Sequence, residues 1–204
     1  MRIVAGRLKG RRLGSPRWDG LRPTSDRLRE TLFNILGDRP HDARVLDACA
    51  GTGAVGLEAI SRGAAHVIFV DDDKRATSLI TKNLAHCGAS SHGTVVTAAL
   101  PAAVALPAMV TPFDLVLLDP PYDDHGIDVI LSAVAARLKA DGLLVFERSI
   151  RRPQFVPLGL EAVKTVTSGE SALDFFLRSR NTRSSVAKET DGDEVSLCRP
   201  ENPV

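Results

Sequence analysis

The segment that decides the fold is Asp47-Ala48-Cys49-Ala50-Gly51-Thr52-Gly53-Ala54-Val55-Gly56. It follows a short apolar strand at 44–46 and precedes a helix that we expect to end near residue 62, before Gly63. Its glycines permit a tight turn and let the backbone approach a ligand closely. A strand, a glycine loop and a helix in this order predict the start of a nucleotide-binding α/β domain. The glycine pattern alone also fits a dinucleotide-binding protein.

Two carboxylates near this loop narrow the class of ligand. Asp71 ends the next strand, at 66–70, and lies 20 residues after Gly51, a spacing that places a carboxylate on a ribose diol. Asp47 lies four residues before Gly51 and would repel a pyrophosphate. A cationic nucleoside that bears an amino acid, such as S-adenosylmethionine, suits Asp47 better, and we predict it as the cofactor.

A second motif, Asp119-Pro120-Pro121-Tyr122, closes the apolar run at 113–118. Prolines lack N–H groups and fix their own φ, so the chain leaves the sheet stiffly and its carbonyl groups can accept hydrogen bonds. At the carboxyl end of a strand, where open α/β sheets bind ligands, Tyr122 can stack on a planar base. Asp119 and the Pro120 carbonyl can then accept hydrogen bonds from an exocyclic amine. The alternative is a turn in which Asp119 and Tyr122 have no chemical role.

The order of apolar segments predicts an α/β fold with a doubly wound, mostly parallel seven-stranded sheet. Strands are expected at 44–48, 66–70, 93–97, 113–118, 142–147, 161–167 and 172–179, and helices at 54–62, 73–86, near 100–106 and at 126–138. The hairpin through 168–171 predicts that the last strand runs antiparallel. A further helix, capped by Thr24 or Ser25 and ended by Gly37, precedes the sheet.

Charge is concentrated at the N-terminus. The first 30 residues hold nine basic and three acidic side chains, although the whole chain has a net charge of only +1. Residues 2–13 are predicted to form a hairpin with a turn at Lys9-Gly10. A basic extension of this kind either binds a polyanion or is only solvated, and its place beside a base-handling motif favours RNA. The residues predicted to bind RNA are Arg2, Arg7, Lys9, Arg11, Arg12 and Arg22.

Length and composition indicate one soluble globular domain. The chain has 204 residues, of which 44% are hydrophobic and 25% are charged. No apolar run is long enough to span a bilayer and no signal peptide is recognisable, so we expect a cytoplasmic monomer without a membrane partner. The three cysteines and five histidines are not in ligand spacing, which predicts neither a disulfide framework nor a metal site.

Four segments in order resemble the RsmD-type guanine-N2 methyltransferases of bacterial small-subunit ribosomal RNA. They are the segments at 2–13 and 21–36, the glycine loop and the Asp-Pro-Pro-Tyr motif, and the resemblance covers about residues 1–180. It implies a class I, Rossmann-like methyltransferase that uses S-adenosylmethionine to methylate N2 of guanine 966 in 16S ribosomal RNA, either free or in an assembling small subunit. We expect a basic hairpin arm at 1–22 and a methyltransferase domain at 23–180. Residues 181–204 are polar and have no apolar period, so we expect them to form a disordered tail.

The resemblance assigns roles to individual residues. Catalysis is expected of Asp119, Pro120, Pro121 and Tyr122. Cofactor binding is expected of Asp47, Ala48, Gly51, Thr52, Gly53, Gly56, Asp71, Asp72, Ala98 and Ala99. Family members often have an acidic residue after the third strand that holds the adenine amine. The segment 97–100 has no carboxylate, so backbone groups are expected to replace it.

Other functions fit parts of the sequence. Adenine-N6 DNA methyltransferases share the Asp-Pro-Pro-Tyr motif, but 204 residues leave no room for a separate target-recognition domain. A release-factor glutamine methyltransferase would more typically have Asn in place of Asp119. The glycine loop also fits an NAD-dependent oxidoreductase, and the basic arm fits a non-catalytic RNA-binding module.

Overall fold

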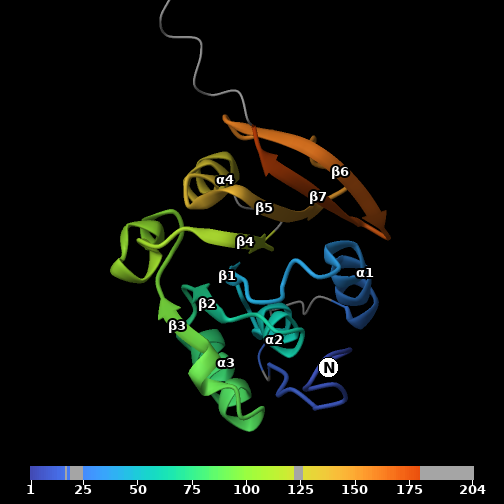
Figure 1. The fold of residues 1–204 in the computed structure, drawn as a ribbon, viewed down its shortest axis with the longest axis vertical. Helices are drawn as coiled ribbons and strands as arrows, with labels where there is room; N and C mark the ends of the chain where they lie inside the picture. The colour runs from blue at the N-terminus through green and yellow to red at the C-terminus, as the bar shows by residue number, and fades with distance from the viewer. Residues whose placement is uncertain (17, 19–24, 122–125, 180–204) are drawn as a thin grey trace, which may run out of the picture.

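The computed structural model describes residues 1–16, 18, 25–121 and 126–179. Its centre is a seven-stranded sheet in the order β3-β2-β1-β4-β5-β7-β6 (Figure 1). The strands are β1 (Arg44–Ala48), β2 (His66–Asp71), β3 (Gly93–Thr97), β4 (Phe113–Leu118), β5 (Leu138–Ser149), β6 (Leu160–Ser168) and β7 (Ser171–Arg178). The first five strands pair in parallel, and β7 is antiparallel to both β5 and β6. The predicted sheet with an antiparallel last strand is confirmed.

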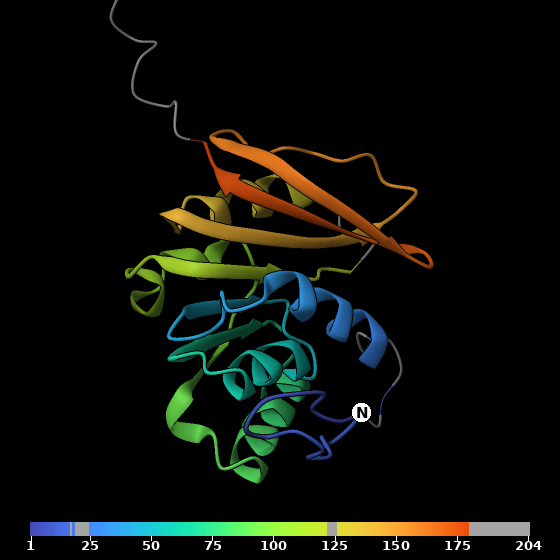
Figure 2. The ribbon, with the colours of Figure 1, turned by 45° about the vertical axis from the view of Figure 1, so that its right-hand side comes forward.

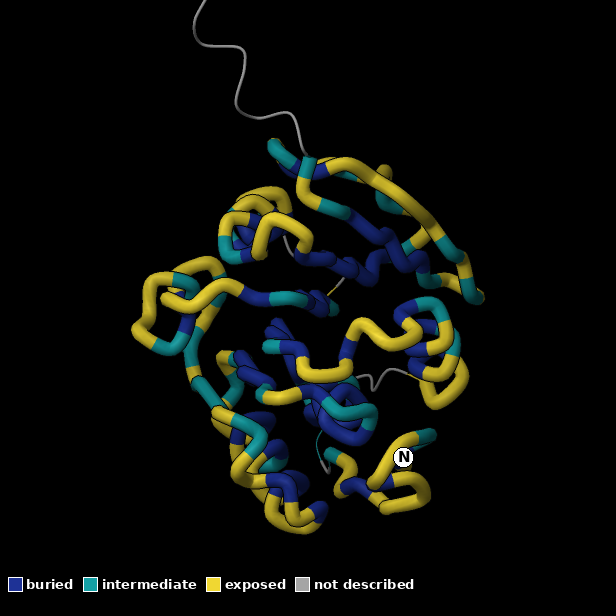
Figure 3. The backbone as a smooth tube through the Cα atoms, viewed as in Figure 1, coloured by how far each residue is buried: buried dark blue, intermediate teal, exposed yellow. Residues whose placement is uncertain are grey.

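Helices cover both faces of the sheet (Figure 2). The helices are α1 (Asp26–Leu36), α2 (Ala54–Ser61), α3 (Lys74–His86) and α4 (Ile127–Ala135), with short 3-10 turns η1 (Ser90–His92), η2 (Ala102–Ala105) and η3 (Pro107–Met109). The first three helices share one apolar cluster with the sheet, whereas α4, η2 and η3 share the other. The central strands are buried on both sides, as Figure 3 shows, which is the usual state of parallel strands.

The helix α1 begins and ends where the sequence predicts. Ser25 is its N-cap, and the Ser25 hydroxyl accepts a hydrogen bond from the Leu28 amide at 3.1 Å. Gly37 follows the helix with a φ of 55°, and its amide donates to the Phe33 carbonyl. Leu28, Leu32 and Phe33 are buried against the domain, so the helix is fixed on the sheet by one apolar face.

The boundary between α4 and β5 differs from the prediction. The apolar pattern predicts a helix over 126–138 and a strand over 142–147, whereas α4 ends at Ala135 and β5 begins three residues later. The Phe113 amide donates to the Arg137 carbonyl at 2.8 Å, so the start of β4 pairs with the chain immediately after the helix. Periodicity does not predict this change, because a buried helix end and a buried strand start are both apolar.

The N-terminal segment, which we call the arm (residues 1–16), packs on the body of the domain. The predicted hairpin is reduced to one antiparallel bridge, between Arg2 and Arg12. Ile3 and Leu8 are buried in the apolar cluster that contains α2. A ribbon this short is not stable alone, so the domain on which it lies keeps it ordered.

Two buried polar side chains of α2 hold the arm. The Glu58 carboxylate accepts hydrogen bonds from the Val4 amide at 2.7 Å and from the Ala5 amide at 2.9 Å. The Ser61 hydroxyl accepts a hydrogen bond from the Leu8 amide at 2.9 Å. Glu58 is completely buried, so these bonds are shielded from water. The arm is therefore docked on the domain by specific hydrogen bonds as well as by apolar contact.

Candidate active site

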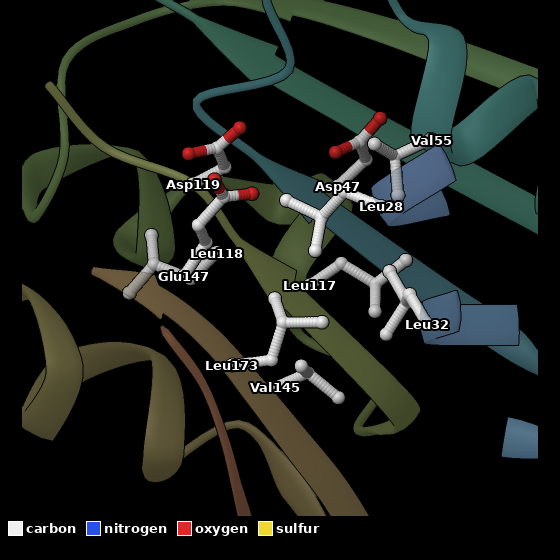
Figure 4. Close-up of a pocket in the computed structure, with 10 residues that line it drawn as sticks. All are labelled: Leu28, Leu32, Asp47, Val55, Leu117, Leu118, Asp119, Val145, Glu147 and Leu173. Atoms are coloured by element: carbon white, nitrogen blue, oxygen red, sulfur yellow. The ribbon is translucent and has the colours of Figure 1, made fainter. Parts of the chain in front are cut away.

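Three carboxylates lie at the carboxyl ends of neighbouring strands. Asp47 of β1 is in register with Leu117 of β4, which is in register with Val145 of β5. Asp119 and Glu147 each lie two residues farther along the chain, and residues two apart on a strand point to the same face. All three carboxylates thus belong to the α1–α2 face of the sheet, and they gather at one end of a pocket in Figure 4.

The pocket is an open hollow, with about 330 Å³ of space free of protein atoms that includes part of the adjoining solvent. Besides the three carboxylates, its lining residues are Leu28 and Leu32 of α1, Val55 of α2, Leu117, Leu118, Val145 and Leu173. A concave site with apolar walls and a few polar groups is the usual composition of a small-molecule site. The structure therefore brings together Asp47 and Asp119, which the sequence predicted from two separate motifs.

Glu147 and the apolar wall are the parts of this pocket that sequence reasoning missed. A signal for Glu147 was present, because it follows an apolar strand in the same way as Asp47, Asp71 and Asp119 do. The apolar residues carry no comparable signal, since Leu28 and the others fit an ordinary core.

The glycine loop forms the sharp turn that its sequence predicts. Gly51 and Gly53 have φ values of 54° and 74°, which favour glycine. Cys49 also has a positive φ, 60°, which is uncommon for a residue with a side chain. A Cβ atom at Gly56 would lie 2.3 Å from the Phe69 ring, so this glycine lets α2 approach β2 closely.

Asp47 is buried at the base of this loop. Its Oδ2 atom accepts a hydrogen bond from the Gly56 amide at 2.8 Å. Burial, followed by the nearby Asp119 and Asp71 carboxylates, raises the pKa of Asp47 to about 8, although the Gly56 hydrogen bond acts in the opposite direction. The negative charges of Asp119 and Asp71 disfavour a further negative charge beside Asp47 and favour a cation there.

Asp71 ends β2 and braces the glycine loop. Its Oδ2 atom accepts a hydrogen bond from the Gly51 amide at 2.8 Å, and its Oδ1 atom accepts one from the Asp73 amide at 3.0 Å. Burial raises the pKa of Asp71 in spite of these two hydrogen bonds. Each carboxylate oxygen has a further lone pair, so Asp71 can also accept a hydrogen bond from a ribose hydroxyl. The neighbouring Asp72 is exposed to solvent.

The other residues predicted to bind the cofactor lie along the same edge. Ala48 and Thr52 are buried, Ala98 is half-buried and Ala99 is exposed. The Ala98 amide donates to the Asp71 carbonyl at 3.1 Å, so it extends the pairing of β2 with β3. The backbone group expected to replace the family's acidic residue is therefore not the Ala98 amide.

Asn83 of α3 connects the glycine loop to the arm. Its Oδ1 atom accepts a hydrogen bond from the Gly14 amide at 2.8 Å, and its Nδ2 atom donates to the Thr52 carbonyl at 3.1 Å. Asn83 is buried, so these bonds are protected from water. Sequence reasoning missed this residue, which lies in an otherwise ordinary amphipathic helix.

The Asp119-Pro120-Pro121 turn leaves the sheet beside β1. The Asp119 amide donates to the Ala48 carbonyl at 3.3 Å, so the pairing of β4 with β1 reaches the Asp-Pro-Pro turn. Pro120 is buried and Pro121 is exposed. Tyr122 lies outside the described residues, and so does Arg22 of the predicted RNA-binding set.

A second hollow, of about 170 Å³, lies next to this turn. Its lining residues are Pro120, Pro121, Phe146, Glu147, Arg148, Ser149 and Arg152. The Arg148 guanidinium pairs with Asp174, with 2.6 Å between Nε and Oδ2, and also donates to the Arg152 carbonyl at 2.5 Å. Arg148 thereby fixes the loop after β5 that forms one side of the hollow.

The arm presents its basic side chains to solvent. The exposed basic residues are Arg2, Arg7, Lys9, Arg11 and Arg12. Arg7 donates to the Ile60 carbonyl at 3.4 Å and Arg11 donates to the His86 carbonyl at 3.3 Å, so both lie over helices of the body. Five of the six residues predicted to bind RNA are thus exposed side chains of the arm.

Among residues 1–16, 18, 25–121 and 126–179, no group of three or more His, Cys, Asp or Glu side chains could hold a metal ion. Within the same ranges, none of the helices combines the length and the apolar character that crossing a bilayer requires.

Comparison with known proteins places the chain in a family. The family model described as "Conserved hypothetical protein 95" matches residues 1–177. The ribosomal RNA small subunit methyltransferase D of Haemophilus influenzae is 35% identical over 172 residues, which cover 83% of this chain and 89% of that protein. A solved structure, a putative methyltransferase yhhF from Escherichia coli, superposes with a TM-score of 0.78 at 34% identity and covers 87% of this chain and 97% of that one.

A more distant structure, SMU.776, is a putative methyltransferase complexed with SAH. It has a TM-score of 0.61 at 15% identity and covers 74% of this chain and 49% of that one, so it shows a common fold alone. The family model and the Haemophilus relative both extend over most of the chain, including the glycine loop and the Asp-Pro-Pro turn. The chain therefore belongs to the RsmD family of methyltransferases, the family described as conserved hypothetical protein 95.

Proposed function

We propose that this protein transfers the methyl group of S-adenosylmethionine to the exocyclic N2 amine of guanine 966 in 16S ribosomal RNA. The observation that supports this most directly is one pocket shared by two motifs. Asp119, from the Asp-Pro-Pro turn, lines the same pocket as Asp47 of β1 and Val55 of α2, which flank the glycine loop. A group bound by the loop and an amine bound by Asp119 would therefore lie next to each other.

S-adenosylmethionine is the cofactor, and when bound it supplies a methyl group on a positively charged sulfur. The residues present suit such a molecule. The charged groups that raise the Asp47 pKa are both carboxylates, so a cation beside Asp47 is electrostatically favoured. Asp71 retains lone pairs for ribose hydroxyls, and Gly51 and Gly53 allow a close backbone approach.

The acceptor amine requires activation, because its lone pair is delocalised into the purine ring. Hydrogen bonds from the amine to Asp119 and to the Pro120 carbonyl would draw its hydrogens out of the ring plane and free the lone pair. The rest of the rate enhancement would come from holding the amine in line with the bond that breaks. Tyr122 is proposed to stack on the base.

The substrate is proposed to be the small-subunit RNA, free or in an assembling subunit. Relatives that cover most of this chain are named for methylation of that RNA. The five exposed basic residues of the arm provide sequence-independent attraction to phosphates. The target base must leave its stack to enter the site, at a cost of a few kcal/mol.

The test is methyl transfer with isotopically labelled S-adenosylmethionine to extracted 16S RNA and to 30S particles that lack the modification. Mass mapping of nuclease fragments then identifies the modified base. Asp119→Ala should lower the transfer rate by about a hundredfold or more and change the affinity for S-adenosylhomocysteine only a few fold. Asp141→Ala, at an exposed position, is the matched control.

Two results would contradict the proposal. One is a transfer rate for Asp119→Ala that is close to that of the unmodified protein. The other is binding of S-adenosylhomocysteine without transfer of label to either form of the RNA.

A further inference from the structure

We propose that Glu147 recognises the N1–H group of the acceptor base and thereby selects guanine over adenine. This inference rests on the proposed function and adds a specificity-determining residue to the same site. The Asp-Pro-Pro turn alone does not supply this selection, because guanine, adenine and cytosine all offer an exocyclic amine. A second polar group must distinguish the ring atom beside that amine.

The sheet register places Glu147 beside Asp119. The last register pair of β4 and β5 is Leu118 with Phe146, and Asp119 and Glu147 are the next residues along the two strands. Neighbouring strands are about 4.8 Å apart, so two groups at the same level can contact adjacent atoms of one base. Both residues line the main pocket, and Figure 4 draws their carboxylates at its polar end.

Glu147 is also the residue that the two hollows share. It lines the main pocket, together with Asp47 and Val55, and the second hollow beside Pro120 and Pro121. Its exposed fraction is 9%, so a base that enters meets a carboxylate largely removed from water. Hydrogen bonds in such surroundings discriminate strongly between bases. If the base does not offer a matching group, the buried polar group loses its partner and no water can replace it.

A carboxylate at this place matches guanine and opposes the alternatives. In guanine the ring atom next to the amine carbon, N1, carries a hydrogen, which the Glu147 carboxylate can accept. The two hydrogens of the amine then remain for Asp119 and the Pro120 carbonyl. In adenine the corresponding ring atom, N1, carries a lone pair and no hydrogen, and so does N3 in cytosine. A carboxylate repels such a lone pair. The geometry therefore favours methylation at guanine N2 over the adenine-N6 alternative that the shared motif leaves open.

The neighbouring Arg148 does not provide this recognition. Its Nε and Nη2 atoms donate to the Asp174 carboxylate at 2.6 and 3.4 Å, and its Nη1 atom donates to the Ser149 and Arg152 carbonyls at 3.2 and 2.5 Å. These bonds occupy the guanidinium and hold the backbone that follows Glu147. Arg148 is a positioning residue for Glu147, and Glu147 is the group directed at the base.

The test compares two acceptors and two proteins. The target guanine of the small-subunit RNA is replaced, by ligation of synthetic fragments, with 2,6-diaminopurine, which keeps the N2 amine but has a lone pair at N1. The value of kcat/KM is measured on both RNAs for the unmodified protein and for Glu147→Gln. The glutamine amide can donate a hydrogen bond to a lone pair. Glu147→Gln should therefore prefer the 2,6-diaminopurine RNA, which has a lone pair at N1, over the guanine RNA, which has N1–H. Glu161→Gln, at an exposed position on β6, is the matched control.

The unmodified protein should favour the guanine RNA by about tenfold or more. In Glu147→Gln the ratio of kcat/KM on the guanine RNA to kcat/KM on the 2,6-diaminopurine RNA should fall at least tenfold. Calorimetry should show an unchanged affinity of this variant for S-adenosylhomocysteine. Glu161→Gln should keep the ratio of the unmodified protein. The inference would be refuted, and the proposed function left intact, if Glu147→Gln lowered kcat/KM equally on both RNAs and so left their ratio unchanged. Should Glu147→Gln fail to fold, equal rates of the unmodified protein on the two RNAs would refute it. No transfer to guanine by the unmodified protein would instead refute the proposed function.

Discussion

Replacing Asp47 with asparagine tests the electrostatics of the cofactor site without any ligand. Burial raises the pKa of this carboxyl from 3.8 to about 8 in the folded protein. Between these values the unfolded chain releases a proton that the folded chain keeps. The free energy of unfolding therefore falls as the pH rises from about 4 to about 8, and this loss is complete above that range.

The size of the effect follows from the two pKa values. Each pH unit in this interval lowers the stability by about 1.4 kcal/mol, so the buried carboxyl costs about 4 kcal/mol at pH 7. Asparagine has no proton to release, and its carbonyl oxygen can still accept the Gly56 hydrogen bond. Asp47→Asn should thus gain stability relative to the unmodified protein steadily from pH 5 to pH 8. If the amide also changes the free energy of unfolding by an amount that does not depend on pH, the plot of the stability difference against pH moves up or down but keeps its slope.

Urea unfolding at pH 5, 6, 7 and 8 measures this difference directly. Asp38→Asn, which makes the same change at an exposed carboxylate, is the matched control. The reasoning would be refuted if the free energies of unfolding of Asp47→Asn and the unmodified protein differed by the same amount at every pH in this range. Such a result would place an ordinary, ionised carboxylate at position 47.

Three further predictions concern the loop and the arm. Asp71→Ala should weaken binding of S-adenosylhomocysteine by about 1.5 to 3 kcal/mol, since a charge-assisted hydrogen bond is lost; an unchanged affinity by calorimetry would remove Asp71 from the site. Glu58→Ala should lower the free energy of unfolding by about 3 kcal/mol, because two amides of the arm lose their buried acceptor. An unaltered urea midpoint would contradict that anchoring role. Changing Arg7, Lys9 and Arg11 together to Glu should weaken RNA binding and flatten its log–log salt dependence by about 0.7 to 0.9 per lost contact. A normal salt series for this variant would show that the arm is only a solvated extension.

Much of the fold could be predicted because the turn residues and the apolar strand patterns of the sequence point to the same structure. Gly51 and Gly53 occupy positions with positive φ, and the apolar strands around them are continuous. The bounds of β1, β3 and β4 match the prediction residue for residue. These strands are short runs of five or six residues, each followed within the chain by a turn or a helix, so few other placements were possible.

The missing parts depend on contacts between distant segments. Glu58 lies 54 residues from the Val4 amide that it binds, and no local pattern connects them. The strand of Glu147 is buried on both faces, so its sequence does not alternate and does not reveal which face Glu147 occupies. The register with β4 decides that face, and register is a property of the folded sheet.

The docking of the arm on α2 has a thermodynamic consequence. A free chain that becomes ordered on binding loses about 1–2 kcal/mol per residue in backbone entropy, which is subtracted from its affinity. Here the hydrogen bonds to Glu58 and Ser61 fix the arm when the domain folds, before any partner arrives. The attraction between the exposed cations of the arm and a polyanion is then reduced only by the cost of ordering their side chains, and no longer by the cost of ordering the backbone.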